Sequence, residues 1–396
     1  MSVPKLRFKG FDGDWTKVSL DKVSKVFDGT HQTPNYVESG IKFVSVENIH
    51  APYDSDKFIT VEAFKKDFKN LPQLNDILMT RITAGEIGAT AIVDDREPLA
   101  YYVSLALIRP KAVVTTPFLN QYIGTPFFKN ELHKRIIHVA FPKKINLGDI
   151  NECLVSLPDK QEEQTKIASF LSSVDEKISQ LTQKYELLSQ YKQGMMQKFF
   201  SQQIRFKADD GSDFGEWEVQ KLGEISKTFS GGTPQSSNKS FYEGSIPFIK
   251  SGEISQDITE QYINEIALQK SSAKLVNKGD LLYALYGATS GQVAISQIDG
   301  AINQAVLCIR SILNTQYLLN FFLLKKEEIL STYLQGGQGN LSAAILKEIY
   351  IPTPCLEEQT KIANFLSAID QKIEVVAQQI EHAKQWKKGL LQQMFV

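Results

Sequence analysis

Two segments of the chain place apolar residues at alternating steps of four and three. The first segment contains Ile167, Leu171, Val174, Ile178, Leu181, Tyr185 and Leu188, and the second contains Ile362, Leu366, Ile369, Ile373, Val376, Ile380 and Ala383. This spacing is a heptad seam, the pattern of helices that pack against other helices. It predicts one long helix within residues 158–200 and another within residues 352–396. A helix of about 39 residues is about 58 Å long.

Both predicted helices carry a start signal. Asp159 lies three residues before Glu162, as in a capping box, and Pro354 fits the first position of the second helix. We therefore expect the helices to begin at these residues.

The remaining sequence alternates short apolar runs with turn residues. The runs predict strands at residues 41–46, 77–82, 89–93, 103–108, 246–249, 281–286 and 293–295. A helical pattern covers residues 315–333. The mixture predicts an α/β (α+β) fold, with one globular domain over residues 1–157 and a second over residues 201–351.

The chain repeats itself. EEQTKIA occupies residues 162–168 and again residues 357–363, 195 positions later, and matches continue downstream in both copies. Upstream, with small insertions, Asp76 and Arg109 correspond to Asp280 and Arg310. The sequence is therefore a tandem duplication of a unit of nearly 200 residues, a period too long for a solenoid.

The duplicated seams favour one pairing of the helices. A single heptad stretch is also typical of a helix packed on its own domain, and that alternative stays open for each copy. However, the chain leaves the first helix, builds the second domain and enters the second helix from that domain. We therefore expect an antiparallel coiled coil with a globular domain at each end and approximate two-fold symmetry.

Length and composition narrow the class of protein. A chain of 396 residues is long enough for two or three domains. Its three cysteines, Cys153, Cys308 and Cys355, have no paired spacing, which favours a reducing compartment. The sequence shows no apolar leader and no run of 18 apolar residues. We expect a cytoplasmic protein with no membrane segment.

Recognisable catalytic and metal-binding motifs are missing from the sequence. It contains no HExxH, no Walker or dinucleotide-binding glycine loop and no recognisable Ser-His-Asp motif. The glycine-rich stretches at residues 231–235 and 335–340 fit turns in a β-rich domain. The repeats share no histidine at matched positions, although a catalytic apparatus used by both halves would be expected to repeat. We expect no catalytic residue, cofactor or metal site in this chain.

Several stretches together resemble one protein family. They are EEQTKIAxFLSxxDxKI after Leu157-Pro158 and after Ile351-Pro352, GGTP at residues 231–234, KGDLLYALYGATSGQVAI at 278–295 and NQAVLCIR at 303–310. This set resembles the specificity subunit of Type I restriction-modification systems, and the likeness covers the whole chain. The first half departs from the pattern, because DGTHQTPNY at residues 28–36 replaces GGTP.

The resemblance implies a DNA-reading subunit without chemistry of its own. Each globular domain would read one half of a split target in double-stranded DNA. The helices would set the spacing between the halves and dock two modification subunits. Those partners would bring S-adenosylmethionine to methylate adenine at N6, and restriction subunits would add cleavage that uses ATP and Mg²⁺. EEQTKIA would then be repeated because two copies of one partner are held in equivalent ways.

The charge of the chain is not that of an independent DNA binder. The formal net charge is -1, and basic residues number 20 against 18 acidic ones in residues 1–156 and 13 against 16 in residues 201–350. Partners would then supply much of the phosphate contact.

Some polar residues in loop-like places have groups that can reach bases or phosphates, although turn chemistry and surface solvation also explain each of them. These candidate DNA contacts are Lys65, Lys66, Lys69, Arg81, Lys143, Lys144, Asn146, Thr233, Lys239, Lys250, Tyr286, Gln292, Gln338 and Asn340. Two other functions stay open, a coiled-coil scaffold that binds no nucleic acid and a self-contained enzyme of unrecognised type. The DNA target cannot be read from the sequence, because recognition loops follow no transferable code.

Overall fold

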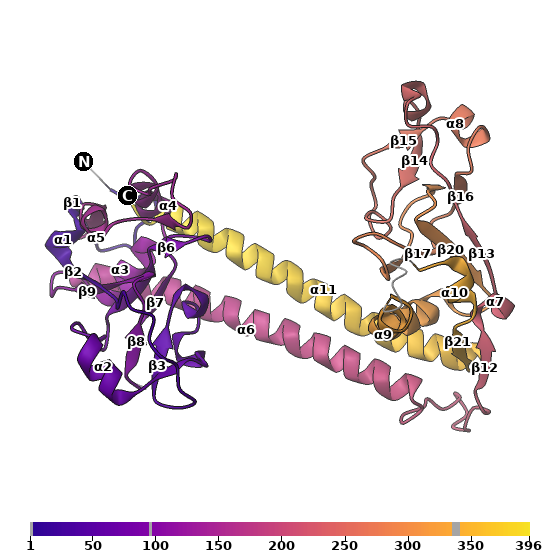
Figure 1. Ribbon diagram of the computed structural model, residues 1–396, viewed down its shortest axis with the longest axis horizontal. Helices are drawn as coiled ribbons and strands as arrows, with labels where there is room; N and C mark the ends of the chain where they lie inside the picture. The colour runs from indigo at the N-terminus through magenta and orange to yellow at the C-terminus, as the bar shows by residue number, and fades with distance from the viewer. Residues whose placement is uncertain (1–2, 95–96, 335–340) are drawn as a thin grey trace. The chain divides into compact units, whose positions relative to one another are not determined.

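The computed structural model describes residues 3–94, 97–334 and 341–396 (Figure 1). The chain forms two compact units, one of Met1–Thr182 with Gln378–Val396 and the other of Gln183–Ala377. Each unit therefore contains segments of both long helices, α6 (Gln161–Phe200) and α11 (Leu356–Gln393). In the described residues, no helix combines the length and the apolar character that crossing a membrane requires.

The first unit is built on two sheets. The central antiparallel sheet has the strand order β2 (Ser24–Asp28), β9 (Leu105–Pro110), β5 (Ile77–Thr80) and β7 (Thr90–Ile92). The second sheet has the order β4 (Phe58–Ile59), β3 (Ile41–Val44) and β8 (Leu99–Tyr101), with β3 and β8 parallel. All four residues of β5 are buried, because strands cover both of its edges and side chains cover both of its faces.

The second unit repeats the central sheet and has one additional strand, β16, in its mixed sheet. Its central sheet has the order β13 (Ser226–Ser230), β20 (Val306–Ser311), β17 (Leu281–Ala284) and β18 (Val293–Ile295). Its mixed sheet has the order β15 (Tyr262–Ile263), β14 (Ile246–Ile249), β19 (Gly300–Ile302) and β16 (Lys274–Val276), with β14 and β19 parallel. The predicted strands are thus confirmed, and the duplication of the sequence is a duplication of the fold.

Short elements connect the sheets to the long helices. Two-stranded ribbons join β1 (Thr16–Ser19) to β11 (Leu154–Leu157), β12 (Glu218–Lys221) to β21 (Tyr350–Thr353), and β6 (Ile82–Thr83) to β10 (Lys143–Lys144). The helices of the first unit are α1 (Leu20–Val23), α2 (Val61–Asp67), α3 (Thr116–Ile123), α4 (Pro126–His133) and α5 (Leu147–Asn151). Those of the second are α7 (Leu222–Ile225), α8 (Glu265–Gln269), α9 (Thr315–Leu334) and α10 (Ala343–Lys347).

The long helices pack together in both units, and they run in opposite directions. In the second unit Lys192 of α6 pairs with Asp370 of α11 at 2.7 Å, and Phe199 packs edge-on against Phe365. In the first unit Lys387 pairs with Asp175 at 2.5 Å. The two ion pairs join matched residues of the repeat with the partners exchanged, which is the reciprocity expected of a two-fold relation between the helices.

The seam residues are mostly buried. Ile167, Leu171, Val174, Leu181, Ile362, Leu366, Ile369 and Val376 are buried, whereas Ile178 and Ile373 are half-buried. Tyr185, which the heptad spacing also assigned to the seam, is exposed. The end of α11 continues into the core of the first unit, where the Phe395 ring packs against Trp15, Phe118 and Tyr122.

EEQTKIA fastens the start of each long helix to its own unit. In the first copy, buried Glu163 accepts hydrogen bonds from Arg7 Nε at 2.7 Å and Nη2 at 2.9 Å. Buried Gln164 accepts from the Thr115 amide at 2.9 Å, and its Nε2 donates to the Val113 and Pro158 carbonyls. A buried carboxylate is stable only when it is paired and hydrogen-bonded, so these contacts fix the register of α6 on its domain.

The second copy makes the matching Glu–Arg and Gln contacts and adds one from a tryptophan. Glu358 is fully buried and accepts from Arg205 Nε at 3.1 Å, from Arg205 Nη2 at 2.8 Å and from Trp217 Nε1 at 2.9 Å. Gln359 accepts from the Asn314 amide at 2.8 Å and donates to the Pro354 carbonyl at 2.7 Å.

These contacts change the explanation of the repeated motif. The resemblance suggested that EEQTKIA repeats because a partner is held twice, but its Glu, Gln, Ile and Ala side chains are buried within their own unit in both copies. The second glutamate, the glutamine, the isoleucine and the alanine of the motif are therefore needed for the fold of each half. The remaining positions are the first glutamate, the threonine and the lysine, and in the second copy the lysine, Lys361, donates to the Lys207 carbonyl and to Asp209.

The predicted helix starts were wrong by one residue for α6 and by two residues for α11. The Lys160 and Cys355 carbonyls accept the first backbone hydrogen bonds of α6 and α11, which makes these residues the N-caps. Asp159 accepts instead from the Thr16 hydroxyl, so it forms no capping box. Pro354 precedes the N-cap, and its carbonyl is the acceptor for Gln359.

The cysteines differ in environment. Burial raises the pKa of Cys153 and of Cys308 to about 12, so both thiols stay protonated at neutral pH. Cys355 is exposed at the N-cap of α11.

We expect Glu358→Gln to destabilise the second unit, because an amide cannot balance the charge of the Arg205 guanidinium. The free energy of unfolding should fall by about 3 kcal/mol, as when one partner of a buried ion pair is lost. Trp217 contacts the carboxylate, so denaturation followed by tryptophan fluorescence measures the loss. Glu357→Gln is the matched control, because its carboxylate is exposed and lies 3.6 Å from Lys361. Equal stability of the two variants would contradict the role of Glu358.

A charge at a buried seam position should separate the helices. Val174→Asp and Ile369→Asp change matched residues that are 4% and 5% exposed, and each would bury a carboxylate without a partner. We expect a loss of several kcal/mol of stability for each. Ser173→Asp, at an exposed neighbouring position, is the control. Calorimetric melting temperatures that matched those of the control would show that the seam is not a core.

Candidate nucleic-acid interface

In each unit, a loop follows the first strand of the central sheet and crosses the mixed sheet. In the second unit this loop is Gly231–Gln235, after β13. A Cβ atom on Gly231 would overlap the Ile302 carbonyl of β19, and one on Gly232 would lie 2.6 Å from the Cβ of Ser272. Both glycines are therefore required by close packing, in a stretch that is irregular and not a regular turn. The other glycine-rich stretch, residues 335–340, lies outside the described residues.

The first unit has the same loop despite its different sequence. Gly29 follows β2, and a Cβ atom there would lie 2.5 Å from the carbonyl carbon and oxygen of Tyr102. Thr30 comes next and bridges to Tyr102 in parallel register. Gly29 and Gly231 thus occupy equivalent places, where neighbouring backbone leaves no room for a Cβ atom. The sequence DGTHQTPNY differs from the second half in the residues that follow this glycine. A cavity of about 200 Å³ lies between this loop and the end of α2, lined by Thr30, Phe68, Lys69 and Asn70.

The matched aspartate and arginine of the repeats form an internal ion pair. Arg109 donates from Nε and Nη2 to Asp76 at 2.9 and 2.7 Å, and Arg310 donates to Asp280 at 2.9 and 2.6 Å. Each carboxylate also accepts a backbone amide from the turn before β5 or β17. These arginines hold the central sheet to the preceding turn, and we do not count them among groups that face a ligand.

The candidate lysines of the first unit lie at its surface. Lys65 and Lys66 are in the last turn of α2, Lys69 follows that helix, and Lys143 and Lys144 form β10; all five are exposed. Asn146 is exposed at the N-cap of α5, and its Nδ2 donates to Asp149 at 2.9 Å.

Arg81 is placed differently from the lysines. Its side chain is 8% exposed, and its guanidinium donates to Asp28 at 2.8 Å and to the Ile145 carbonyl at 3.1 Å. These bonds connect Arg81, which follows β5, to the last residue of β2 and to the residue after β10. Arg81 therefore holds these surface segments together while it is itself buried.

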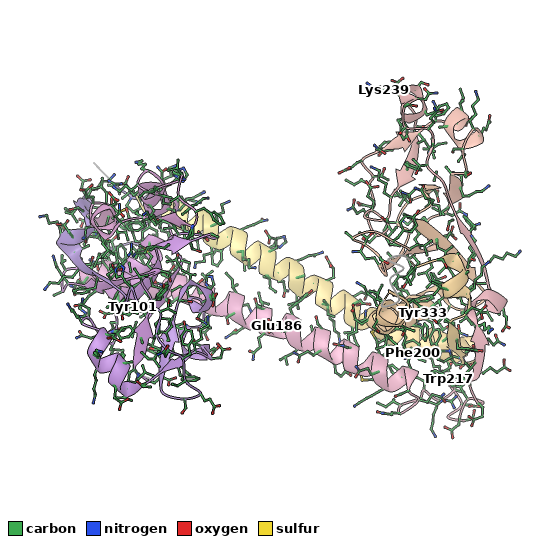
Figure 2. All side chains as sticks on the ribbon, in the orientation of Figure 1. Tyr101, Glu186, Phe200, Trp217, Lys239 and Tyr333 are labelled. Atoms are coloured by element: carbon green, nitrogen blue, oxygen red, sulfur yellow. The ribbon has the colours of Figure 1, made fainter. Side chains whose placement is uncertain are left out.

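The candidates of the second unit are spread over several loops. The exposed Thr233 donates from its hydroxyl to Gln304 Oε1 at 2.6 Å, a pair that the sequence analysis missed because the residues lie far apart in the chain. Lys239 begins a short 3-10 turn, Lys239–Tyr242, and Figure 2 shows it at the outer end of this unit, beyond β14 and β15. Gln338 and Asn340 lie outside the described residues.

The other three candidates of the second unit flank strands. Lys250 is half-buried at the end of β14, where its amide donates to Glu253. Tyr286 follows β17, and burial raises the pKa of its hydroxyl. Gln292 is exposed immediately before β18.

Two hollows of the second unit lie beside α6 and α9, away from these loops. One of about 460 Å³ is lined by Phe200, Phe321, Tyr333 and Tyr350, and one of about 660 Å³ is lined by Gly194, Phe200 and Leu324 among others. Within residues 3–94, 97–334 and 341–396, no group of three or more His, Cys, Asp or Glu side chains could hold a metal ion.

Comparison with known proteins accounts for both halves. The model of the family described as "Type I restriction modification DNA specificity domain" matches residues 12–190 and 215–385. The putative type I restriction enzyme MjaX specificity subunit of Methanocaldococcus jannaschii is 29% identical, over 96% of this chain and 92% of its own length. The EcoR124I/EcoR124II specificity subunit of Escherichia coli is 27% identical over 54% of this chain and 55% of its own.

Solved structures share the fold. The S subunit of a Type I restriction-modification system from M. genitalium aligns with a TM-score of 0.64 at 15% identity, covering 100% of this chain and 99% of that one. A chain solved in work on complex assembly and conformational transition of the type I R-M system aligns with a TM-score of 0.60 at 18% identity, covering 96% and 97%.

The family match covers both repeats, and in each repeat it covers the sheets as well as most of the long helix. The chain belongs to the Type I restriction-modification specificity family, as a non-catalytic DNA recognition subunit with two target recognition domains.

Proposed function

We propose that residues 1–157 and residues 201–351 each read one half of a bipartite target in double-stranded DNA, and that residues 158–200 and 352–396 set the distance between the halves. One observation carries this proposal. Two domains of the same topology are each fastened to the start of one long helix by the same buried Glu–Arg and Gln contacts. A helix that is fixed in register on its domain keeps a constant length between its two ends, whereas a flexible linker would allow many distances.

The proposed DNA contacts are exposed polar groups of the loops and of α2, together with the half-buried Lys250 and Tyr286. They are Lys65, Lys66, Lys69, Lys143, Lys144, Asn146, Thr233, Lys239, Lys250, Tyr286 and Gln292. We leave Arg81 out, because its guanidinium is already bonded to Asp28 and Ile145. Lysine reaches phosphate or guanine, and asparagine and glutamine can pair with adenine.

The remaining functions belong to partners in this proposal. Two modification subunits dock on the helices and bring S-adenosylmethionine for adenine N6 methylation, and restriction subunits bring ATP and Mg²⁺. A chain with net charge -1 has little excess of phosphate-binding groups, so the partners also supply phosphate contacts. The assembly works in the cytoplasm, where it meets its DNA.

A scaffold without nucleic-acid binding is the alternative. A gel shift with genomic fragments separates the two, provided that the chain is assembled with its modification subunits. We expect a retarded band that survives excess non-specific competitor and weakens as salt rises, because phosphate contacts release counterions. A complex that assembles but retards no fragment would leave the scaffold as the function.

The domains should be exchangeable readers. We expect replacement of residues 201–351 by the second domain of another family member to change one half of the methylated target and to keep the other half. The reason is that the buried contacts of Glu163 and Gln164 stay within the first unit. Sequencing of methylated adenines in cells with the complete system measures both halves. A change in both halves would rule out independent reading.

A further inference from the structure

The segment after α4 presents two apolar side chains to solvent. Val139 is 97% exposed and Phe141 is 91% exposed, more than any other large hydrophobic residue that the structure describes. Isolated surface hydrophobic residues need no explanation, but an aliphatic and an aromatic side chain two residues apart, both almost fully exposed, indicate a contact site.

The base of this segment is fixed. The Ile137 amide donates to the Lys144 carbonyl at 2.8 Å, and β10 pairs with β6 in antiparallel register. The following residue, Ile145, is fully buried, and its amide and carbonyl are bonded to Arg81. Residues 138–143 therefore form the tip of a finger whose two ends are tied to the domain.

The segment that contains the tip carries basic residues and no acidic residue. Between Glu131 and Asp149 the sequence contains Lys134, Arg135, Lys143 and Lys144 and no acidic residue. Lys134 and Arg135 pair with Glu131 beside the base, whereas Lys143 and Lys144 are exposed next to Phe141. Exposed apolar side chains beside lysines fit a polyanion that also offers apolar surface.

We propose that residues 138–144 form a DNA-inserting finger, in which Phe141, supported by Val139, enters between base pairs of the half-site read by the first domain. This inference rests on the proposed function and deepens it. Lys143 and Lys144 then lie at the flanking phosphates. Apolar wedges on proteins partly unstack a base step in this way, and stacking on an aromatic ring recovers part of the cost.

The finger explains what Arg81 does. Its guanidinium bonds the Ile145 carbonyl and the Asp28 carboxylate, so it joins the base of the finger to the start of the Gly29 loop. The finger and the loop are thereby held together as one reading surface, although Arg81 itself is buried.

The test uses the chain assembled with its modification subunits and a duplex that carries the target mapped by methylation sequencing. 2-Aminopurine is placed at successive steps of the first half-site, because its fluorescence rises when a base unstacks. We expect binding to raise the fluorescence at one step. Phe141→Ala should abolish that rise and weaken binding about tenfold, the size of one lost base–aromatic stack. Phe127→Ala, another exposed phenylalanine on α4, should change neither.

Lys143→Gln and Lys144→Gln should each lower the slope of log K against log salt by about 1, as when one phosphate contact is lost. Lys22→Gln is the charge control, at an exposed lysine whose Nζ lies 3.8 Å from Asp21. Melting temperatures should not change, because the altered side chains are exposed.

Three results would contradict the proposal that this finger inserts into DNA. Unchanged affinity, salt slope and fluorescence in the variants, with the target still methylated, would leave the proposed function standing without it. Weaker assembly with the modification subunits at unchanged DNA affinity would assign these residues to a protein partner. If the unaltered complex bound no duplex, the finger and the proposed function would fall together.

Discussion

Two buried carboxylates, Glu163 and Glu358, are the constraint on which the rest of this structure depends. Each lies near the start of a long helix and pairs with an arginine from the segment that leads into its domain, Arg7 or Arg205, and Glu358 also accepts a hydrogen bond from Trp217. An unpaired buried charge costs several kcal/mol, so a helix that slipped or rotated on its domain would lose this pair and the neighbouring glutamine bonds together. Each domain is consequently held in one register on its helix, as the proposed role of the helices in setting a distance requires.

Two ion pairs between the long helices also favour a single register. Asp175 with Lys387 and Asp370 with Lys192 are one interaction made twice with the partners exchanged. Both pairs are partly exposed, so they contribute little to stability on their own. Their value lies in specificity, because an antiparallel pair shifted by a heptad would separate both pairs at once. The buried seam supplies the attraction and the charges select the register.

Much of this architecture could be predicted from the sequence. The heptad spacing and the repeat predicted both helices and their opposed directions, and runs such as residues 246–249 predicted strands, because periodicity reports burial directly. The helix starts were harder to predict. Asp159 and Pro354 are residue types typical of helix starts, but here they accept hydrogen bonds from Thr16 and Gln359 instead. The pairing of Glu163 with Arg7 joins residues far apart in the chain, and no local pattern indicates it.

The site was harder to predict than the fold. Arg81 looked like a surface base reader, yet it is buried by contacts with Asp28 and Ile145. Matched residues also differ, because Trp217 donates to Glu358, whereas Trp15 Nε1 finds no acceptor among the described residues. Phe141 and Val139 have the composition of core residues, and only the structure shows them in solvent. In loops, the direction of a side chain is set by tertiary contacts, and the spacing of apolar residues in the sequence does not reveal these contacts.

Insertion of a heptad into both long helices tests most directly whether they set the spacing of a bipartite target. Seven residues after Leu181 and seven after Val376 keep the seam in phase and lengthen each helix by about 10 Å. At a rise of about 3.4 Å per base pair, the unread spacer in the methylated sequence should grow by about three base pairs while both half-sites stay the same. A methylome of cells carrying this variant reads the spacer directly. An active variant that still marked the original spacing would contradict the claim that α6 and α11 measure the distance.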